Sequence, residues 1–145
     1  MSSGQARPGP EGRSILIVED DADLREALSE VLRDEGYSVE GAGDGQEALD
    51  RLRRDPPPSL ILLDLTMPVM NGWQFRAEQR QDPLLSGIPV VILSAGDHLA
   101  EQMAPLGIQD YVHKPIELDE LLRTVERYLV DGQQSITGSR RKTTD

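Results

Sequence analysis

The 145-residue sequence contains no cysteine, few aromatic residues and no long hydrophobic run. The absence of cysteine excludes disulfide bonds, thiolate metal ligands and catalysis by a cysteine nucleophile. Aromatic residues make up only 3% of the chain, with one tryptophan, Trp73, and one phenylalanine, Phe75. The apolar runs span a few residues, whereas a membrane-spanning helix needs about 20. The N-terminus also lacks the apolar segment of a secretory signal, so we expect a cytoplasmic protein that does not enter a membrane.

The chain is strongly acidic, because 26 acidic and 15 basic residues give a formal net charge of −11. Such a surface repels phosphate backbones, so the sequence predicts no direct binding to nucleic acid. The basic cluster Arg140-Arg141-Lys142 is shorter than the roughly 5–8 residues of a nucleic-acid patch. We expect part of the acidic surplus to bind a cation instead.

Strand-like and helix-like segments alternate five times along the chain, which is typical of a parallel sheet flanked by helices. Residues 1–13 are predicted to be a disordered lead and 131–145 a disordered tail, with one domain over 14–130. The fully apolar run 60–63 favours a central strand, and the weaker run 37–42 favours an edge. The expected strands are 14–18, 37–42, 60–63, 90–93 and 111–113, and the expected helices are 22–35, 45–54, 73–80, 97–104 and 118–129.

Residues that favour helix ends support these boundaries. Asp23 and Glu26 have the spacing of a capping box, with Asp21 as the alternative N-cap of the first helix. Gly36 fits the left-handed residue that ends this helix. Neither His98 nor His113 lies in a pattern typical of a phosphodonor histidine, and both are expected to be structural or exposed to solvent.

Polar residues follow four of the apolar runs, at the point where each predicted strand ends. Glu19 and Asp20 follow the first strand, Asp64 the third, Ser94 the fourth and Lys114 the fifth. The carboxyl ends of parallel strands share one edge of the sheet, where ligands bind. Carboxylates, a hydroxyl and an ammonium group at one edge could bind a divalent cation and a phosphoryl group. With no soft ligand in the set, Mg²⁺ is the expected cation.

This arrangement resembles the receiver domain of the two-component response regulator family over residues 14–130. Met67-Pro68, Met70-Asn71-Gly72 and a tyrosine, Tyr111, three residues before Lys114 add to the resemblance. The family resemblance implies an α/β fold: a doubly wound, five-stranded parallel sheet of order 2-1-3-4-5, with helices on both faces as in flavodoxin. We expect a stand-alone, single-domain receiver. Pro105 lies where the fourth helix of the family continues, so this helix is expected to be short or displaced.

The resemblance also implies a phosphorylation site that requires Mg²⁺. Asp64 would accept the phosphoryl group and bind the metal. Asp20 would be a direct metal ligand, Glu19 would act through water, and the backbone carbonyl of Thr66 would complete the protein ligands. Glu19 replaces the aspartate that is more frequent in the family.

Further residues would contact the phosphoryl group or transmit the response. Lys114 would contribute a positive charge and Ser94 a hydroxyl hydrogen bond. Ser94 and Tyr111 would form the switch, since the hydroxyl moves toward the phosphoryl group and the aromatic ring then turns inward. The Lys114–Pro115 peptide bond would be cis.

The implied function is that of a signalling phospho-acceptor, with no enzymatic activity beyond its own phosphorylation and dephosphorylation. The donor would be a sensor histidine kinase or a histidine phosphotransfer protein. The output would be a protein–protein contact or a further phosphorelay step, with a target that the sequence does not name. The alternatives are a pseudo-receiver that binds partners without phosphorylation and an aspartate-nucleophile phosphatase of the haloacid dehalogenase type. The phosphatase needs a second aspartate where this chain has Thr66.

Overall fold

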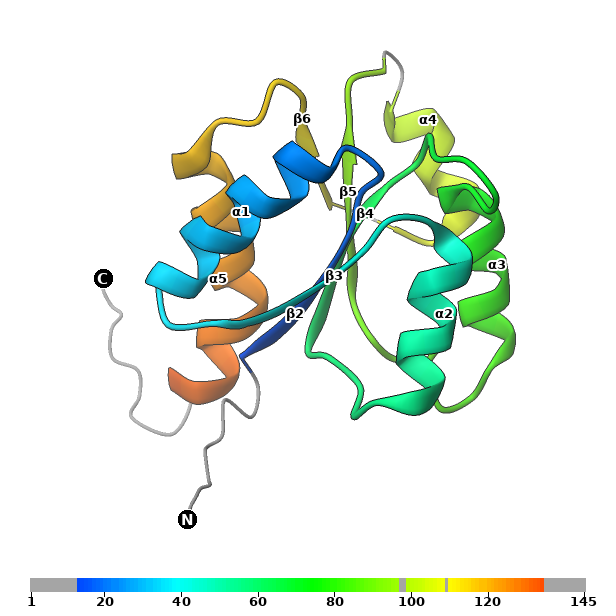
Figure 1. Cartoon of the computed structure of the whole chain (residues 1–145), viewed down its shortest axis with the longest axis horizontal. Coiled ribbons are helices and arrows are strands. Elements are labelled where there is room, and N and C mark those ends of the chain that lie inside the picture. The colour runs from blue at the N-terminus through cyan, green and yellow to red at the C-terminus, as the bar shows by residue number, and fades with distance from the viewer. Residues whose placement is uncertain (1–12, 97–98, 109, 135–145) are drawn as a thin grey trace.

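The computed structural model describes residues 13–96, 99–108 and 110–134, and the protein forms one parallel sheet covered by helices on both faces (Figure 1). The strand order is β3-β2-β4-β5-β6, which is 2-1-3-4-5 in chain order, as predicted. The strands are β2 Ser14–Val18, β3 Ser38–Ala42, β4 Leu60–Asp64, β5 Val90–Ser94 and β6 Asp110–His113. The helices are α1 Ala22–Asp34, α2 Gly45–Arg54, α3 Gly72–Gln81, α4 Leu99–Met103 and α5 Leu118–Gln134, with a 3₁₀ turn, η1, at Ala104–Leu106.

The helices divide the hydrophobic core into two layers. Helices α1 and α5 cover one face of the sheet, and α2, α3 and α4 cover the other (Figure 1). Successive residues of the central strand β4 alternate between the two layers, with Leu62 packing toward Leu28 and Leu121, and Leu63 packing toward Leu49 and Phe75. All five residues of β4 are buried, so the prediction of a central strand is confirmed. Each fully buried aliphatic side chain contributes about 1.5–3 kcal/mol, which fixes the position of β4 and of Asp64 at its end.

Side-chain caps fix the points at which the first helices begin. The Asp21 carboxylate accepts a hydrogen bond from the Leu24 N–H at 3.1 Å, so Asp21, the predicted alternative, is the N-cap of α1 and the capping box of Asp23 and Glu26 is wrong. Asn71 and Gln74 form a reciprocal capping box at the start of α3. Gly36 has a φ of 99°, as predicted for the residue that ends α1. The caps of α1 and α3 place both helix N-termini at the edge of the sheet where β2 and β4 end.

The fourth helix is short, as Pro105 predicted, and it continues only as the 3₁₀ turn η1. Two arginines of α3 hold this turn by its backbone carbonyls: Arg76 Nε donates to Leu106 O at 2.9 Å and Arg80 Nη1 to Pro105 O at 3.1 Å. Gly107, with a φ of 70°, then turns the chain toward β6. The position of α4 and η1 therefore depends on contacts with α3 as well as on proline.

The last helix is longer than predicted. Helix α5 runs to Gln134, beyond the predicted end at 129, so residues 131–134 of the predicted tail are helical. The apolar face that suggested the helix ends at Leu129, and the sequence Val130-Asp131-Gly132-Gln133-Gln134 gave no periodic signal for its continuation. Residues 1–12 and 135–145 of the predicted lead and tail, and His98, lie outside the described residues. Within the described ranges no helix is both long and apolar enough to cross a membrane.

A candidate phosphorylation and magnesium site

A cavity opens where β2, β4, β5 and β6 end, and it contains most of the residues that the sequence singled out. The register of the sheet brings these residues together, since Val18 pairs with Leu63, Asp64 with Leu93, and Ser94 with His113. The residues that line the cavity are Glu19, Asp20, Asp21, Asp64, Leu65, Thr66, Trp73, Ser94, Ala95, Gly96, Gln102 and Lys114.

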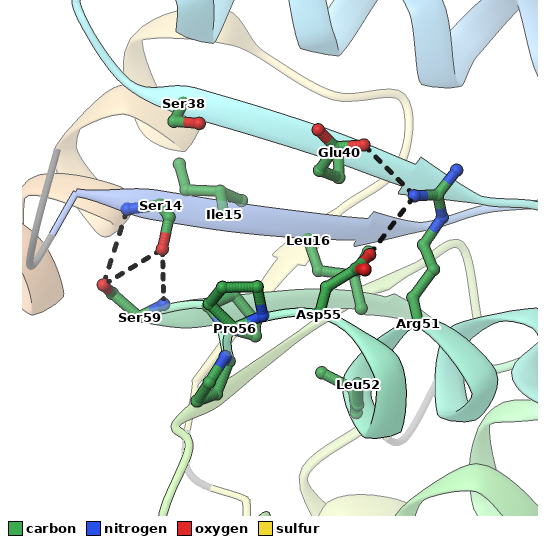
Figure 2. A pocket seen from close by; sticks show the side chains of 12 residues that line it. Ser14, Ile15, Leu16, Ser38, Glu40, Arg51, Leu52, Asp55, Pro56 and Ser59 are labelled. Atoms are coloured by element: carbon green, nitrogen blue, oxygen red, sulfur yellow. Dashed lines mark hydrogen bonds and ion pairs between the residues drawn. The ribbon is translucent and has the colours of Figure 1, made fainter. Parts of the chain in front are cut away.

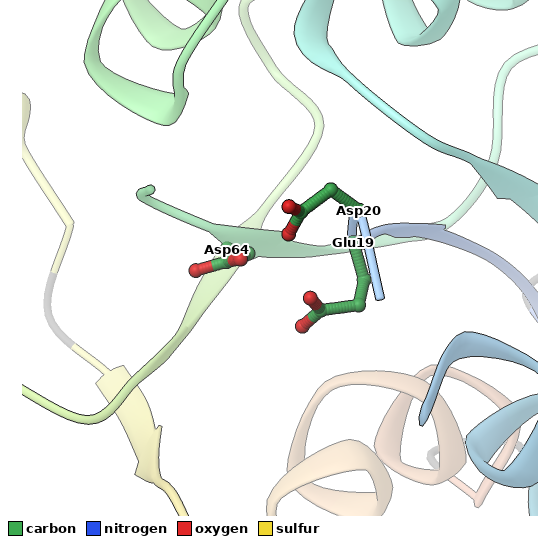
Figure 3. A group of neighbouring side chains, drawn as sticks. All are labelled: Glu19, Asp20 and Asp64. Carbon is green, nitrogen blue, oxygen red and sulfur yellow. The ribbon is translucent and has the colours of Figure 1, made fainter. Parts of the chain in front are cut away.

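Three carboxylates form the acidic centre of this cavity (Figure 3). One oxygen from each of Glu19, Asp20 and Asp64 lies within 4.8 Å of the others. Glu19 is 1% exposed and Asp64 is 5% exposed, whereas Asp20 is open to solvent. Two buried carboxylates and one exposed carboxylate are hard oxygen donors at a spacing suited to a small divalent cation.

Lys114 lies against the two buried carboxylates. Its Nζ is 2.8 Å from Glu19 Oε1 and 3.6 Å from Asp64 Oδ2. The backbone holds the same two side chains, because the Asp21 N–H donates to Glu19 Oε2 at 3.1 Å and the Thr66 N–H donates to Asp64 Oδ1 at 3.2 Å. One lysine therefore faces two buried acids, and the cluster keeps an excess of negative charge.

The titration of Asp64 reflects this excess. Burial raises the pKa of Asp64 to about 6, and the nearby charge of Glu19 acts in the same direction. The Thr66 N–H and the charge of Lys114 oppose this rise without cancelling it. Burial alone would lower the pKa of Lys114, but its contacts with Glu19 and Asp64 raise it, so Lys114 stays protonated. A cation bound beside Asp64 would relieve the repulsion.

The two predicted switch residues lie in different surroundings. Ser94 lines the cavity, where its hydroxyl accepts a hydrogen bond from the Gly96 N–H at 3.2 Å. Tyr111 is 40% exposed and contacts the ring of His113 edge to face, at 6.4 Å between ring centres. The structure therefore brings Ser94 to the site and leaves Tyr111 outside it. The Lys114–Pro115 peptide bond is cis.

The loop between β4 and α3 approaches the site closely. The Gly72 N–H donates to Leu65 O at 2.9 Å, and a Cβ at position 72 would lie 2.6 Å from the Asp64 carbonyl oxygen. Only glycine allows this approach, so Gly72 fixes the start of α3 against the end of β4. The Asn71-Gly72 pair predicted a turn here but gave no sign of this contact.

Sequence reasoning missed a polar residue of the cavity wall and two features of the backbone near it. Gln102 of α4 lines the cavity, although nothing in this helix of five residues distinguishes it. Arg25 of α1 donates a hydrogen bond to the backbone carbonyl of Glu19, and only the folded structure shows the contact. Val69 has a φ of 64°, which is strained for a β-branched residue, and a sequence pattern does not reveal it.

Comparison with known proteins agrees with this geometry. A sequence model of the response regulator receiver domain matches residues 15–126. The chain belongs to this family. The receiver domain is 40% identical over 117 residues to the response regulator MprA of Mycobacterium leprae (strain TN), a match that covers 79% of this chain and 50% of MprA. The chain thus spans about half the length of the curated relatives it matches.

Solved structures show the same receiver fold. The chemotaxis response regulator CheY4 of Vibrio cholerae superposes with a TM-score of 0.74 at 30% identity, over 81% of this chain and 98% of CheY4. The receiver domain of a sensor histidine kinase from Pseudomonas aeruginosa PAO1 has a TM-score of 0.73 at 30% identity, over 82% and 98% of the two chains. That structure carries a magnesium ion in its active-site cleft. The predicted flavodoxin-like fold and receiver family are confirmed.

Proposed function

We propose that this receiver domain accepts a phosphoryl group on Asp64 in the presence of Mg²⁺ and signals through the resulting change of conformation. The observation that carries the proposal is the buried pair of carboxylates, Glu19 and Asp64, facing a single lysine with Asp20 beside them. A cluster of this kind costs folding energy, and a bound cation would balance its excess negative charge and leave Lys114 to pair with an incoming phosphoryl group.

The carboxylates would hold the metal in separate ways. Asp20 and Asp64 would bind Mg²⁺ directly, the carbonyl of Thr66 would be a third protein ligand, and Glu19 would act through water. When bound, Mg²⁺ would neutralise negative charge on the transferring phosphoryl oxygens.

The transfer itself needs little more than position and charge. An Asp64 carboxylate oxygen would form a bond to phosphorus as the bond from phosphorus to a histidine nitrogen of the donor breaks, with the electron pair left on that nitrogen. Lys114, 3.6 Å from Asp64 Oδ2, would move from the carboxylate to the phosphoryl oxygens. Ser94, whose hydroxyl lines the same cavity, would donate a hydrogen bond to one of these oxygens.

The response would follow from a shift between two conformations. Ser94 would be drawn toward the phosphoryl group, and Tyr111, now 40% exposed, would turn inward and change the surface of β6 and its neighbours. The donor would be a histidine kinase or a histidine phosphotransfer protein in the cytoplasm. The output would be a protein contact or a phosphorelay step, and the only chemistry of the domain would be its own phosphorylation and dephosphorylation.

The test is the intact mass of the protein after incubation with Mg²⁺ and a small acyl phosphate. We expect a gain of one phosphoryl group that disappears with a chelator and in Asp64→Asn. Asp55→Asn, a carboxylate at the opposite edge of the sheet, is the matched control and should gain the group normally. Lys114→Ala should keep Mg²⁺ binding but lose the change of conformation on phosphorylation.

Two outcomes would overturn the proposal. Phosphorylation that persists in Asp64→Asn would move the acceptor elsewhere. No mass gain in a folded protein that also fails to respond to Mg²⁺ would favour a binding module that works without phosphorylation.

A further inference from the structure

We propose that Arg25 is a positioning residue for the metal site, and that it fixes the peptide unit from which the Asp20 carboxylate projects. This inference rests on the proposed Mg²⁺ site and names a residue of α1 that the site needs without touching the ion. Arg25 makes three contacts with the backbone around the site, whereas the Asp20 carboxylate accepts no hydrogen bond from the described residues.

Arg25 hydrogen-bonds to the backbone of the loop between β2 and α1. Its guanidinium Nη1 donates to the backbone carbonyl of Glu19, and its own N–H donates to Asp21 O at 2.9 Å. The N–H of Glu19 itself donates to Ala42 O of β3 at 3.0 Å. Both backbone polar groups of Glu19 are therefore held, one by the sheet and the other by Arg25.

The Arg25 side chain reaches this carbonyl by lying across Gly41 of β3. A Cβ at position 41 would lie 3.0 Å from Arg25 Cδ and 3.3 Å from Arg25 Nε. A glycine at this point of the edge strand leaves room for the arginine, and any larger residue would push against it. Gly41 and Arg25 therefore form one structural unit, although they come from different elements.

The carbonyl of Glu19 and the N–H of Asp20 belong to one peptide plane. A rotation of that plane would swing the Asp20 side chain away from Glu19 and Asp64. The other two carboxylates have supports of their own, because Lys114 lies against both of them, at 2.8 Å and 3.6 Å. Among the described residues, none donates a hydrogen bond to the Asp20 carboxylate, so its direction depends on the backbone that Arg25 holds.

An electrostatic role and a positioning role of Arg25 predict opposite changes in Mg²⁺ affinity when Arg25 is replaced. A positive charge near a cation site repels the cation, so simple neutralisation of Arg25 would tighten Mg²⁺ binding. A positioning role requires the reverse, because a misdirected Asp20 weakens the site more than the lost repulsion strengthens it. The sign of the change in affinity therefore separates the two roles.

The experiment titrates Mg²⁺ into the full chain and two variants, Arg25→Met and Arg33→Met. Arg33 is a matched control, since it lies on α1 like Arg25 and its guanidinium also donates to a backbone carbonyl. Its acceptor is Val39 O of β3, at 3.0 Å, near the end of the strand that lies away from the site. Binding is read from Trp73 fluorescence, because Trp73 lines the cavity, and independently from the rise in melting temperature with Mg²⁺.

We expect the dissociation constant for Mg²⁺ to rise about fivefold or more in Arg25→Met and to stay unchanged in Arg33→Met. Both variants should lose a similar amount of stability without metal, because each loses one hydrogen bond to a carbonyl. Gly41→Ala keeps the charge but crowds Arg25, and should weaken Mg²⁺ binding in the same direction by a smaller factor. This third variant also tests the inference if Arg25→Met folds poorly.

The outcomes distinguish this inference from the proposed function. If the unaltered protein binds no Mg²⁺ by either measurement, the proposed function fails. If it binds Mg²⁺ and Arg25→Met binds equally well or more tightly, the proposed function stands and the positioning role is overturned. Equal weakening in Arg25→Met and Arg33→Met would also overturn it, since general destabilisation would then explain the loss.

Discussion

A cavity lies at each edge of the sheet, and the two cavities differ in how far their charged groups are buried. At the edge where the strands begin, a cavity of about 720 Å³ is larger than the cavity of about 470 Å³ at the acidic edge (Figure 2). There, Ser14 and Ser59 bond to each other's backbone, since the Ser59 N–H donates to Ser14 Oγ at 3.1 Å and the Ser14 N–H to Ser59 Oγ at 3.4 Å. Arg51 Nη1 lies 3.2 Å from Glu40 Oε1 and 3.9 Å from Asp55 Oδ2.

At the larger cavity one arginine faces two carboxylates, but all three side chains reach solvent, which screens their charges. At the acidic edge Glu19 and Asp64 are buried side by side, with one lysine between them and the exposed Asp20 nearby. An excess of buried charge, rather than the size of a cavity, therefore distinguishes the candidate site in this fold. Four experiments test this difference between the two edges.

The largest effect is expected from Asp64→Asn in the metal-free protein. Burial and Glu19 raise the pKa of Asp64 to about 6, from 3.8 in its unperturbed state, so the ionised carboxylate destabilises the fold at pH 7. Replacing it should raise the free energy of unfolding by about 2–3 kcal/mol. Chemical denaturation in a chelating buffer measures this, and a variant less stable than the unaltered protein would contradict it.

The same stabilisation should depend on pH. The folded-state pKa of Asp64, about 6, lies above its unfolded value, so the folded protein binds more protons than the unfolded chain between about pH 4 and pH 6. Stability due to this group therefore falls as pH rises through that range. The advantage of Asp64→Asn should shrink by about 2 kcal/mol between pH 7 and pH 4. Parallel stability curves for the two proteins would show that Asp64 does not titrate in this way.

A smaller effect is expected from Mg²⁺ itself. At tenfold excess over its dissociation constant, Mg²⁺ should stabilise the folded protein by about 1.4 kcal/mol. Asp20→Asn should lose this gain, and Asp55→Asn at the edge where the strands begin should keep it. Thermal denaturation with and without Mg²⁺ measures the difference. An equal loss in both variants would mean that the cation binds diffusely to an acidic surface.

The smallest effect is expected from Arg51→Met at the edge where the strands begin. Arg51 is partly exposed and its ion pairs reach solvent, so its loss should cost about 0.5–1 kcal/mol of stability. Phosphorylation and Mg²⁺ binding should remain unchanged, because Arg51 lies at the opposite edge. If this variant lost phosphorylation or Mg²⁺ binding, the two edges of the sheet would be functionally coupled, contrary to this prediction.

Much of the fold could be predicted from local sequence patterns. The apolar runs gave the strands to within a residue or two, and the resemblance to receiver domains gave their order in the sheet. The main error was the end of α5, which runs to Gln134 past its apolar face. A helix can continue as a polar segment when its preceding turns are packed against the sheet, and periodicity cannot report that.

The candidate site could be predicted as a set of residues but not as an arrangement. Glu19, Asp20, Asp64, Ser94 and Lys114 follow predicted strands, so their place at one edge follows from the parallel sheet. The sequence did not indicate that Lys114 lies closer to Glu19 than to Asp64. It also did not indicate that Tyr111 is exposed, or that Arg76 and Arg80 hold η1. Each of these depends on contacts between residues far apart in the chain.

The order of residues along the chain settles which chemical groups lie at the carboxyl edge of the sheet, because alternating strands and helices allow few ways to pack. Which of these groups are buried, which charges are paired, and how Arg25 holds the backbone before Asp20 follow from the folded structure alone. Burial and electrostatic balance depend on all the elements packed around a residue, whereas a local pattern reports only its neighbours along the chain.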